Sequence, residues 1–174
     1  MTTGPELNDP SETISIYKTS FDEGNNQAKG NMFDISAKES DLLLKSFSIH
    51  VDQPGTAVPV KVYVKKASYV GSETNLDDWS LICSTTLTSA GPEQPTKIPL
   101  DVCTEHKIPQ NEKHGLYIVV DSVANMIYTS KDPSPNGVLA TTERFVIHEG
   151  IGKGADFANS YGPSRLWNGE LHYA

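Results

Sequence analysis

Hydrophobic and polar residues alternate along much of the chain, which is the pattern of a β-strand with one buried face. The clearest example is 59–66, where Val60, Val62 and Val64 alternate with residues expected to face water. No stretch of a dozen residues keeps apolar side chains at the spacing of an amphipathic helix. The pattern predicts about ten short strands, at 13–19, 31–37, 41–52, 59–66, 79–88, 96–101, 115–121, 125–130, 143–149 and 166–173.

Turn-forming residues separate these strands, as in 53–55 (Gln-Pro-Gly) and 90–92 (Ala-Gly-Pro). Many short strands joined by frequent turns are typical of an antiparallel sandwich. We therefore predict an all-β fold. We expect a single antiparallel β-sandwich, jelly-roll-like, over 13–174, preceded by a flexible N-terminal arm at 1–12.

Charge narrows the range of partners. Among the 174 residues, 22 acidic side chains outnumber 14 lysines and arginines, which gives a formal charge of −8. Binding to nucleic acid or to an anionic membrane depends on basic side chains, so neither partner is expected. No run approaches the roughly 20 apolar residues of a membrane-spanning helix. The opening residues, MTTGPELNDPSET, show neither the basic nor the apolar region of a signal peptide.

The two cysteines, Cys83 and Cys103, lie in or next to predicted strands. If 79–88 and 96–101 form a hairpin, the register brings the two cysteines about one residue pair from alignment, and a disulfide is geometrically feasible. The alternative is two isolated thiols. A disulfide would indicate an oxidising compartment. The sequence contains no CxxC motif, which argues against a zinc or redox site.

Motifs for catalysis do not emerge from the sequence. Five histidines are scattered along the chain, and none belongs to an HExxH motif. Segment 150–154 (Gly-Ile-Gly-Lys-Gly) has neither the P-loop nor the dinucleotide-binding spacing, so we interpret it as a flexible glycine connection between two strands. We expect no enzymatic activity and no cofactor, and we rank a hydrolase or lyase last among the alternatives.

The acidic turn that begins at Asp22 supplies oxygen ligands of the kind that calcium prefers. Asp22, Glu23 and Asn25 are the candidate ligands, although their spacing is not that of an EF-hand. The alternative interpretation is a solvated turn that binds no metal.

Exposed aromatic rings can stack on the C–H face of a sugar, because a flat apolar face matches it. Tyr69, Trp79 and Tyr161 lie near predicted turns and are the candidates for stacking, with Arg165 adding a polar contact. The alternative for the tryptophans is a core position. We favour the core for Trp167, because its strand closes the domain.

Several short motifs, taken in order, resemble those of a known family. They are GNMFDI at 30–35, ASYVGSE at 67–73, WSL at 79–81, TSAGP at 88–92, GIGKG at 150–154 and PSRLWNGELHY at 163–173. The chain is similar to a β-rich domain of exported bacterial proteins with sorting tails and of diatom and related algal proteins. This resemblance implies a secreted or surface β-sandwich without an established enzymatic mechanism. The two cysteines, Lys29 and Lys38 depart from the pattern.

Two functions from different classes follow. The first is a non-enzymatic extracellular or cell-surface structural module that assembles through contacts with other copies or with matrix proteins. Edge strands offer a route, because their free backbone groups can extend a neighbouring sheet. Segment 13–19 is the candidate, with an edge position in its own sheet as the alternative. The second function is a carbohydrate-binding module, in which a polysaccharide stacks on the aromatic residues named above.

Overall fold

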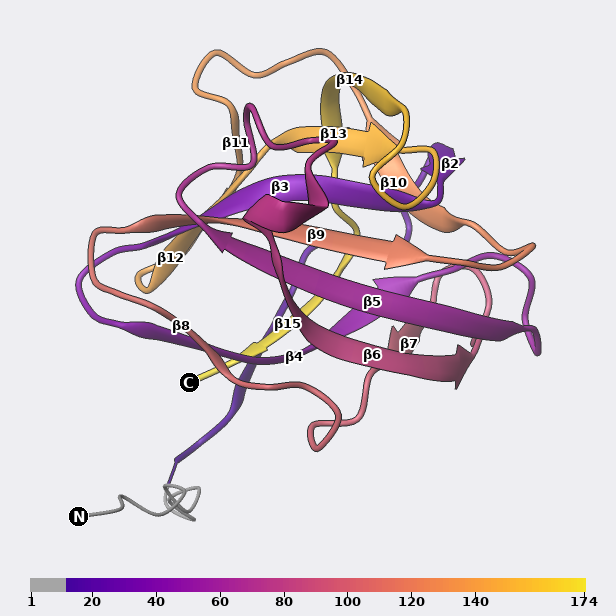
Figure 1. Ribbon diagram of the computed structural model, residues 1–174, viewed down its shortest axis with the longest axis horizontal. Coiled ribbons are helices and arrows are strands. Elements are labelled where there is room, and N and C mark those ends of the chain that lie inside the picture. The colour runs from indigo at the N-terminus through magenta and orange to yellow at the C-terminus, as the bar shows by residue number, and fades with distance from the viewer. Residues whose placement is uncertain (1–11) are drawn as a thin grey trace.

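Two antiparallel sheets face each other in the computed structural model, which describes residues 12–174 (Figure 1). The smaller sheet has the order β1-β15-β4-β7, and β8 also pairs with β4. The N-terminal arm predicted at 1–12 lies, apart from Glu12, outside the described residues. The strands of the smaller sheet are β1 (Ser15–Lys18), β15 (Gly169–Tyr173), β4 (Leu42–His50), β7 (Pro95–Lys97) and β8 (His106–Ile108).

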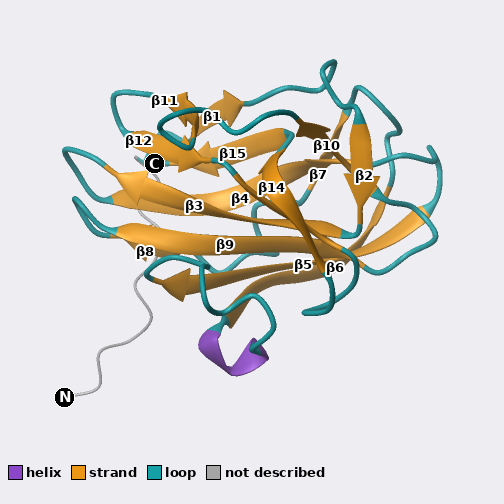
Figure 2. Cartoon of the chain, turned by 90° about the horizontal axis from the view of Figure 1, so that it is seen from above, coloured by secondary structure: helices purple, strands orange, loops and turns teal. Residues whose placement is uncertain are grey.

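The larger sheet has the order β2-β10-β14-β13-β3-β9-β5-β6, and the β11–β12 hairpin extends it by pairing β12 with β3. Figure 2 shows β3, β9 and β5 running side by side, with the short 3₁₀ helix η1 (Leu76–Asp78) to one side. No helix within 12–174 has the length and apolar character needed to cross a bilayer. The strands are β2 (Asn26–Ala28), β3 (Gly30–Ala37), β5 (Ala57–Lys66), β6 (Ser80–Thr88), β9 (Lys113–Val120), β10 (Met126–Ser130), β11 (Val138–Thr141), β12 (Phe145–His148), β13 (Gly150–Lys153) and β14 (Ser160–Leu166).

The structure confirms the all-β antiparallel sandwich, but the described residues divide into fifteen strands rather than about ten. Several of the additional strands, such as β2 and β8, are three residues long. A strand of this length is too short to show an alternating pattern. The strand predicted at 166–173 is interrupted, because β14 ends at Leu166 and β15 begins at Gly169.

The space between the sheets is filled by side chains at alternate positions, as the strand pattern predicts. Val60, Val62 and Val64 are all buried in this core. Trp167 is also buried, and its ring stacks on Phe33 with the ring centroids 5.0 Å apart. The predicted core position of Trp167 is therefore confirmed.

The outer face of the larger sheet is partly covered, which corrects the prediction that this side of 59–66 faces water. Tyr63 is buried there, and its ring centroid lies 5.1 Å from that of Phe157. Tyr117 on β9 is also buried and stacks on Tyr63 at 5.8 Å. We call this second hydrophobic group the outer cluster; its buried members are Met32, Tyr63, Trp79, Tyr117 and Val119.

The glycine-rich segment 150–154 contains a strand, which corrects its interpretation as a flexible connection. β13 pairs with β3 on one side and with β14 on the other. A β-carbon on Gly150 would overlap the carbonyl oxygen of Met32 and would lie 2.8 Å from the β-carbon of Phe33. Glycine is therefore needed here for close approach within a sheet, a role that glycine has in some strands.

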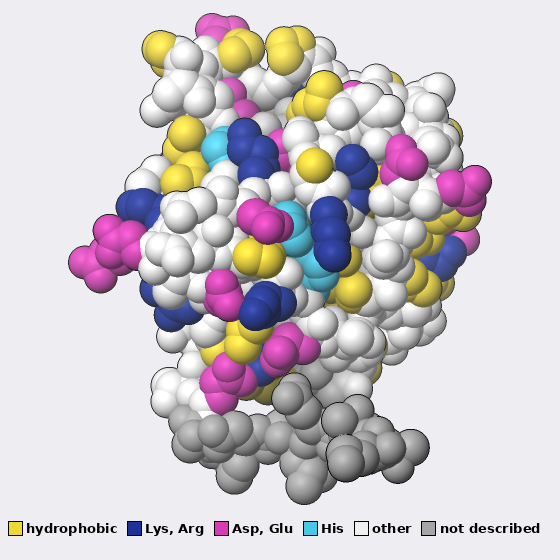
Figure 3. All heavy atoms as spheres, turned by 60° about the vertical axis from the view of Figure 1, so that its left-hand side comes forward, with side chains coloured by type: hydrophobic (Ala, Val, Ile, Leu, Met, Phe, Trp, Pro, Cys, Tyr) yellow, Lys and Arg dark blue, Asp and Glu magenta, His cyan; other side chains and the backbone are white. Residues whose placement is uncertain are grey.

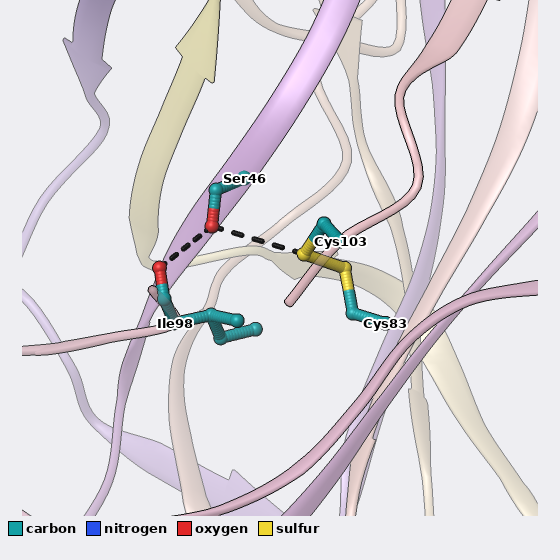
Figure 4. Close-up of a disulfide and its surroundings, with 4 residues drawn as sticks. All are labelled: Ser46, Cys83, Ile98 and Cys103. Atoms are coloured by element: carbon teal, nitrogen blue, oxygen red, sulfur yellow. Dashed lines mark hydrogen bonds between the residues drawn. A yellow bond between two sulfur atoms is a disulfide. The ribbon is translucent and has the colours of Figure 1, made fainter. Parts of the chain in front are cut away.

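The disulfide between Cys83 and Cys103 is formed, with the two Cα atoms 4.4 Å apart. It does not lie in the predicted hairpin, because β6 pairs with β5 in the larger sheet whereas β7 pairs with β4 in the smaller one. Cys103 lies in the segment between β7 and β8, so the disulfide links the two sheets. Beside it, Ser46 Oγ donates to the carbonyl oxygen of Ile98 at 2.7 Å and lies 3.8 Å from Cys103 Sγ (Figure 4).

Candidate functional site

Two of the four residues predicted to bind carbohydrate lie together. Tyr161 and Arg165 of β14 line a pocket of about 190 Å³ with Asn26 and Gln27 of β2 and Tyr128 of β10. We call it the Tyr161 pocket. β10 pairs with β2 on one side and with β14 on the other, so one continuous piece of sheet sets the spacing of the five residues.

Arg165 is the cation of the Tyr161 pocket. Its Nη1 donates to the carbonyl oxygens of Pro163 at 2.9 Å and Ser164 at 3.4 Å. Within residues 12–174, no carboxylate forms an ion pair with Arg165, and its buried Nε has no hydrogen-bond partner. Burial raises the pKa of the Tyr128 hydroxyl, and the nearby guanidinium opposes that rise. The hydroxyl therefore remains protonated at neutral pH and keeps a proton that it can donate.

Trp79, a third residue predicted to bind carbohydrate, does not line the Tyr161 pocket. It is buried in the outer cluster, and its indole N–H donates to the carbonyl oxygen of Ser72 at 2.9 Å. The ring packs edge-on against Tyr117, with centroids 6.0 Å apart. In this arrangement Trp79 packs the loop before β6 against the sheet.

Tyr69, the fourth candidate, packs beside the outer cluster and is half-buried. Its backbone N–H donates to Asp34 Oδ1 at 3.0 Å, and Ser68 Oγ donates to Oδ2 of the same carboxylate at 2.5 Å. Burial, followed by the charges of Asp34 and Glu73, raises the pKa of the Tyr69 hydroxyl to about 12. Of the three predicted stacking rings, Tyr161 is the most accessible, with 44% of its surface exposed.

The three calcium candidates, Asp22, Glu23 and Asn25, all lie in an exposed turn. The Asn25 side chain donates to the Ser130 carbonyl at 2.9 Å and accepts from the Ser130 N–H at 2.7 Å. Its amide group is therefore bonded to the backbone of β10. Asp22 accepts from Ser20 Oγ at 3.1 Å. In the described part of the chain, no group of three or more histidine, cysteine, aspartate or glutamate residues is arranged to hold a metal ion.

A chain of hydrogen bonds runs from Glu112 through His114 to His106. The Glu112 carboxylate lies 2.9 Å from His114 Nε2, and His114 Nδ1 lies 2.9 Å from His106 Nε2. His114 belongs to β9 and His106 to β8, so the hydrogen bond between them links the two sheets. Burial, then His114 and Lys66, lower the pKa of His106 to about 4. His106 is therefore neutral at physiological pH and suited to a structural hydrogen bond.

Ser36 Oγ and His148 Nε2 lie 2.8 Å apart, which is the separation of a hydroxyl nucleophile from its base. Burial, followed by the charge of Lys113, lowers the pKa of His148. Neither Ser36 nor His148 lines the Tyr161 pocket or the two further cavities of similar or larger size. The pair thus cross-links β3 and β12, and neither residue belongs to the lining of these three cavities.

Lys153, from the glycine-rich segment, is fully buried. Its Nζ donates to the carbonyl oxygens of Glu73 at 2.8 Å and Ala158 at 2.5 Å, and to Ser160 Oγ at 2.9 Å. Burial lowers its pKa. With three acceptors around its ammonium group, Lys153 connects the loops that cover the outer cluster.

The largest of these cavities, about 360 Å³, lies at one end of β5 and β9. Its two lysines already have acceptors: Lys61 Nζ lies 3.4 Å from Asp156, and Lys29 Nζ donates to the carbonyls of Ser122 and Ala124 at 2.8 and 3.0 Å. Both ammonium groups are therefore already bonded within the fold, whereas Asp121, the other acidic residue of the lining, forms no ion pair among the described residues. The lining residues are Lys29, Pro59, Lys61, Val119, Val120, Asp121, Gly154, Ala155 and Asp156.

β6 is the border strand of the larger sheet. The Thr104 N–H donates to the Ile82 carbonyl at 2.8 Å, so this carbonyl faces away from β5. Because backbone groups alternate sides along a strand, the N–H and C=O groups of Ser84, Thr86 and Thr88 also face away from β5. No backbone group within 12–174 bonds to them. We call 84–88 the free edge of β6.

Segment 13–19 was the candidate for edge pairing with another copy. It contains β1, which pairs with β15 at the border of the smaller sheet. The alternative interpretation, an edge strand of its own sheet, is therefore correct. β1 presents the exposed Ile16 and ends at Lys18, whereas the free edge of β6 contains no charged residue. A lysine on an edge strand hinders pairing with another chain, so β6 is the better template.

No family model matches the chain, and no curated protein matches it. The resemblance to a surface β-domain thus remains an expectation that rests on short motifs. Two features of the described residues can make new contacts: the free edge of β6, whose backbone groups lack partners, and the Tyr161 pocket.

Sequence reasoning did not identify the residues of the free edge or the two amide side chains of the Tyr161 pocket. A signal for the free edge was present, since Ser-Thr-Thr-Leu-Thr at 84–88 combines strand-forming residues with no charge and no proline. No comparable signal marked Asn26 and Gln27. They belong to a three-residue strand that is defined by its long-range pairing with β10.

Proposed function

We propose that this protein is a non-enzymatic surface module that assembles by pairing the free edge of β6 with the same strand of a second copy. One observation carries the proposal: a row of backbone donors and acceptors in strand geometry that lacks partners among the described residues. Such a row is a template for another strand. Regular pairing between β5 and β6 from Ala57 to Val62 holds the template in place.

The chemistry of the free edge suits pairing with itself. A two-fold axis at Thr86 places Thr86 opposite its own copy and Ser84 opposite Thr88. Like charges directly opposite each other destabilise a strand pair, and 84–88 contains no charge. Threonine also favours strands, and cross-strand threonine pairs stabilise them. The lysines, prolines and bulges that protect natural edges do not occur at 84–88.

Two further observations support a structural, extracellular role. The Cys83–Cys103 disulfide is compatible with an oxidising compartment, where such bonds persist. Several groups capable of proton transfer or nucleophilic attack also have partners inside the fold. His106 and His114 bond to each other, and Lys153 bonds to three acceptors.

Substituting Thr86→Lys is expected to weaken self-association at least about tenfold, or roughly 1.4 kcal/mol, because two lysines would then face each other across the dimer axis. Thr86 is exposed, so the monomer should keep its stability to within about 0.5 kcal/mol. The matched control is Thr74→Lys, which adds the same charge at an exposed loop position. Sedimentation velocity over a range of protein concentrations gives the dimer constant of each variant.

We expect the wild type and Thr74→Lys to dimerise with similar constants. Added salt should strengthen both dimers by screening the net negative charge of each copy, which is −8 in the wild type. Equal dimer constants for Thr86→Lys and Thr74→Lys would exclude β6 as the interface. A wild-type protein that stays monomeric at millimolar concentration would exclude the assembly itself.

A further inference from the structure

We infer that the Tyr161 pocket binds an anionic sugar residue, a pyranose ring that carries a carboxylate or a sulfate group. This inference is independent of the proposed assembly, because the pocket is formed by β2, β10 and β14, whereas β6 borders the larger sheet at its other end. Three properties of the pocket lead to this ligand: its ring, its charge and its amide groups.

Tyr161 provides the ring. With 44% of its surface exposed, it is among the few large hydrophobic residues left open to solvent. Its hydroxyl end lies close to Gly154, where an added β-carbon would be 2.9 Å from the phenol oxygen. An aromatic side chain has few rotatable bonds, so it loses little conformational entropy when a flat ligand stacks on its open surface.

Arg165 provides the charge. The residues that line the pocket include this one cation and no acidic side chain. Two Nη1 bonds to backbone carbonyls orient the guanidinium, and no carboxylate within 12–174 neutralises it. By contrast, on the face of the molecule turned forward in Figure 3, acidic and basic side chains lie next to one another. A planar guanidinium with no carboxylate partner among residues 12–174 suits a carboxylate or a sulfate, which it can bind through two parallel hydrogen bonds.

Asn26 provides hydroxyl recognition. Its amide group offers both donors and an acceptor, which match the mixed character of sugar hydroxyls, and Gln27 lines the pocket beside it. The Oδ1 of Asn26 accepts from the Gln27 N–H at 2.8 Å, and this bond fixes the orientation of the Asn26 amide. The Tyr128 hydroxyl adds a protonated phenol. A ring, one cation and neutral hydrogen-bonding groups on rigid strands are the features of a preformed site for a polar ring ligand.

The test is isothermal titration calorimetry with four probes: an oligogalacturonate, a sulfated galactose oligosaccharide, a neutral galactose oligosaccharide and inorganic sulfate. We expect at least one of the two acidic oligosaccharides to bind at least about tenfold more tightly than the neutral one, with affinity that falls as salt rises. Inorganic sulfate, which lacks a ring to stack on Tyr161, should bind at least about tenfold more weakly than that acidic oligosaccharide.

Four variants assign the binding to this pocket. Arg165→Ala should weaken acidic oligosaccharide binding at least about tenfold, and Arg165→Lys should recover only part of it, because lysine lacks the planar fork. Tyr161→Ala should weaken binding of the acidic sugar without changing that of sulfate. Arg144→Ala is the control, since Arg144 is the other arginine of the chain and does not line the pocket.

Three outcomes would overturn the inference. Equal affinity for neutral and acidic sugars would remove the role of Arg165. Binding of sulfate as tight as that of the sugars, unaffected by Tyr161→Ala, would identify a free-anion site. No binding of either acidic oligosaccharide to a folded wild type would exclude the ligand class. The Thr86→Lys variant separates this inference from the assembly, because its sugar affinity should equal that of the wild type.

Discussion

Alanine at position 150 is expected to destabilise the fold by about 3 kcal/mol, the upper end of the usual effect of overpacking. The added methyl group would overlap the Met32 carbonyl oxygen and crowd the β-carbon of Phe33. Backbone atoms cannot rotate aside as a flexible side chain does, so β13 and β3 would have to separate. Urea unfolding followed by circular dichroism measures the loss. It should be accompanied by weaker protection of the Ile151–Met32 pairing in hydrogen exchange.

Gly137→Ala is the matched control for this substitution. Gly137 has a φ of +64°, and a β-carbon there would meet no atom within 4 Å. Its replacement should therefore impose only backbone strain, about 1 kcal/mol. If Gly150→Ala costs no more than Gly137→Ala, then 150–154 is the flexible connection that its glycine content suggested, and β13 is wrongly placed.

Removing the disulfide has the second large expected effect. The double variant Cys83→Ala, Cys103→Ala should lose about 3 kcal/mol of unfolding free energy, because the bond closes a loop with a sequence separation of 20 residues. It also fastens β6 to the segment that leads into the smaller sheet. Urea unfolding in the presence and absence of a thiol reductant measures this contribution.

The reductant should destabilise the wild type by the same amount and should leave the double variant unchanged. If the oxidised and reduced wild-type proteins unfold at the same urea concentration, the disulfide does not stabilise the link between the sheets. The same experiment bears on location, because a fold that depends on this bond requires an oxidising compartment.

Much of the sandwich could be predicted because burial leaves a mark on sequence at every second position. Val60, Val62 and Val64 show one face of a strand directly, and their burial is confirmed. Alternation does not tell which strand is the neighbour. The hairpin expected for 79–88 and 96–101 is therefore wrong, although the disulfide that it suggested is formed.

The outer face of the larger sheet was harder to predict, because loops that are distant in sequence cover it. Trp79 and Tyr63 carry no local sign that the loops on either side of them close over the sheet. The candidate site shows the same limit. Tyr161 and Arg165 are four positions apart and were identified together, whereas Asn26 and Gln27 join them only through the pairing of β2 with β10.

The most direct test of the assembly is amide hydrogen exchange along β6, measured at protein concentrations about a hundredfold apart. The N–H groups of Thr85 and Leu87 face β5, where these residues pair with Val60 and Val58, and should be protected at both concentrations. The N–H groups of Ser84, Thr86 and Thr88 should exchange rapidly in dilute protein and become protected in concentrated protein. Rapid exchange of these three amides at both concentrations would contradict assembly through the free edge of β6.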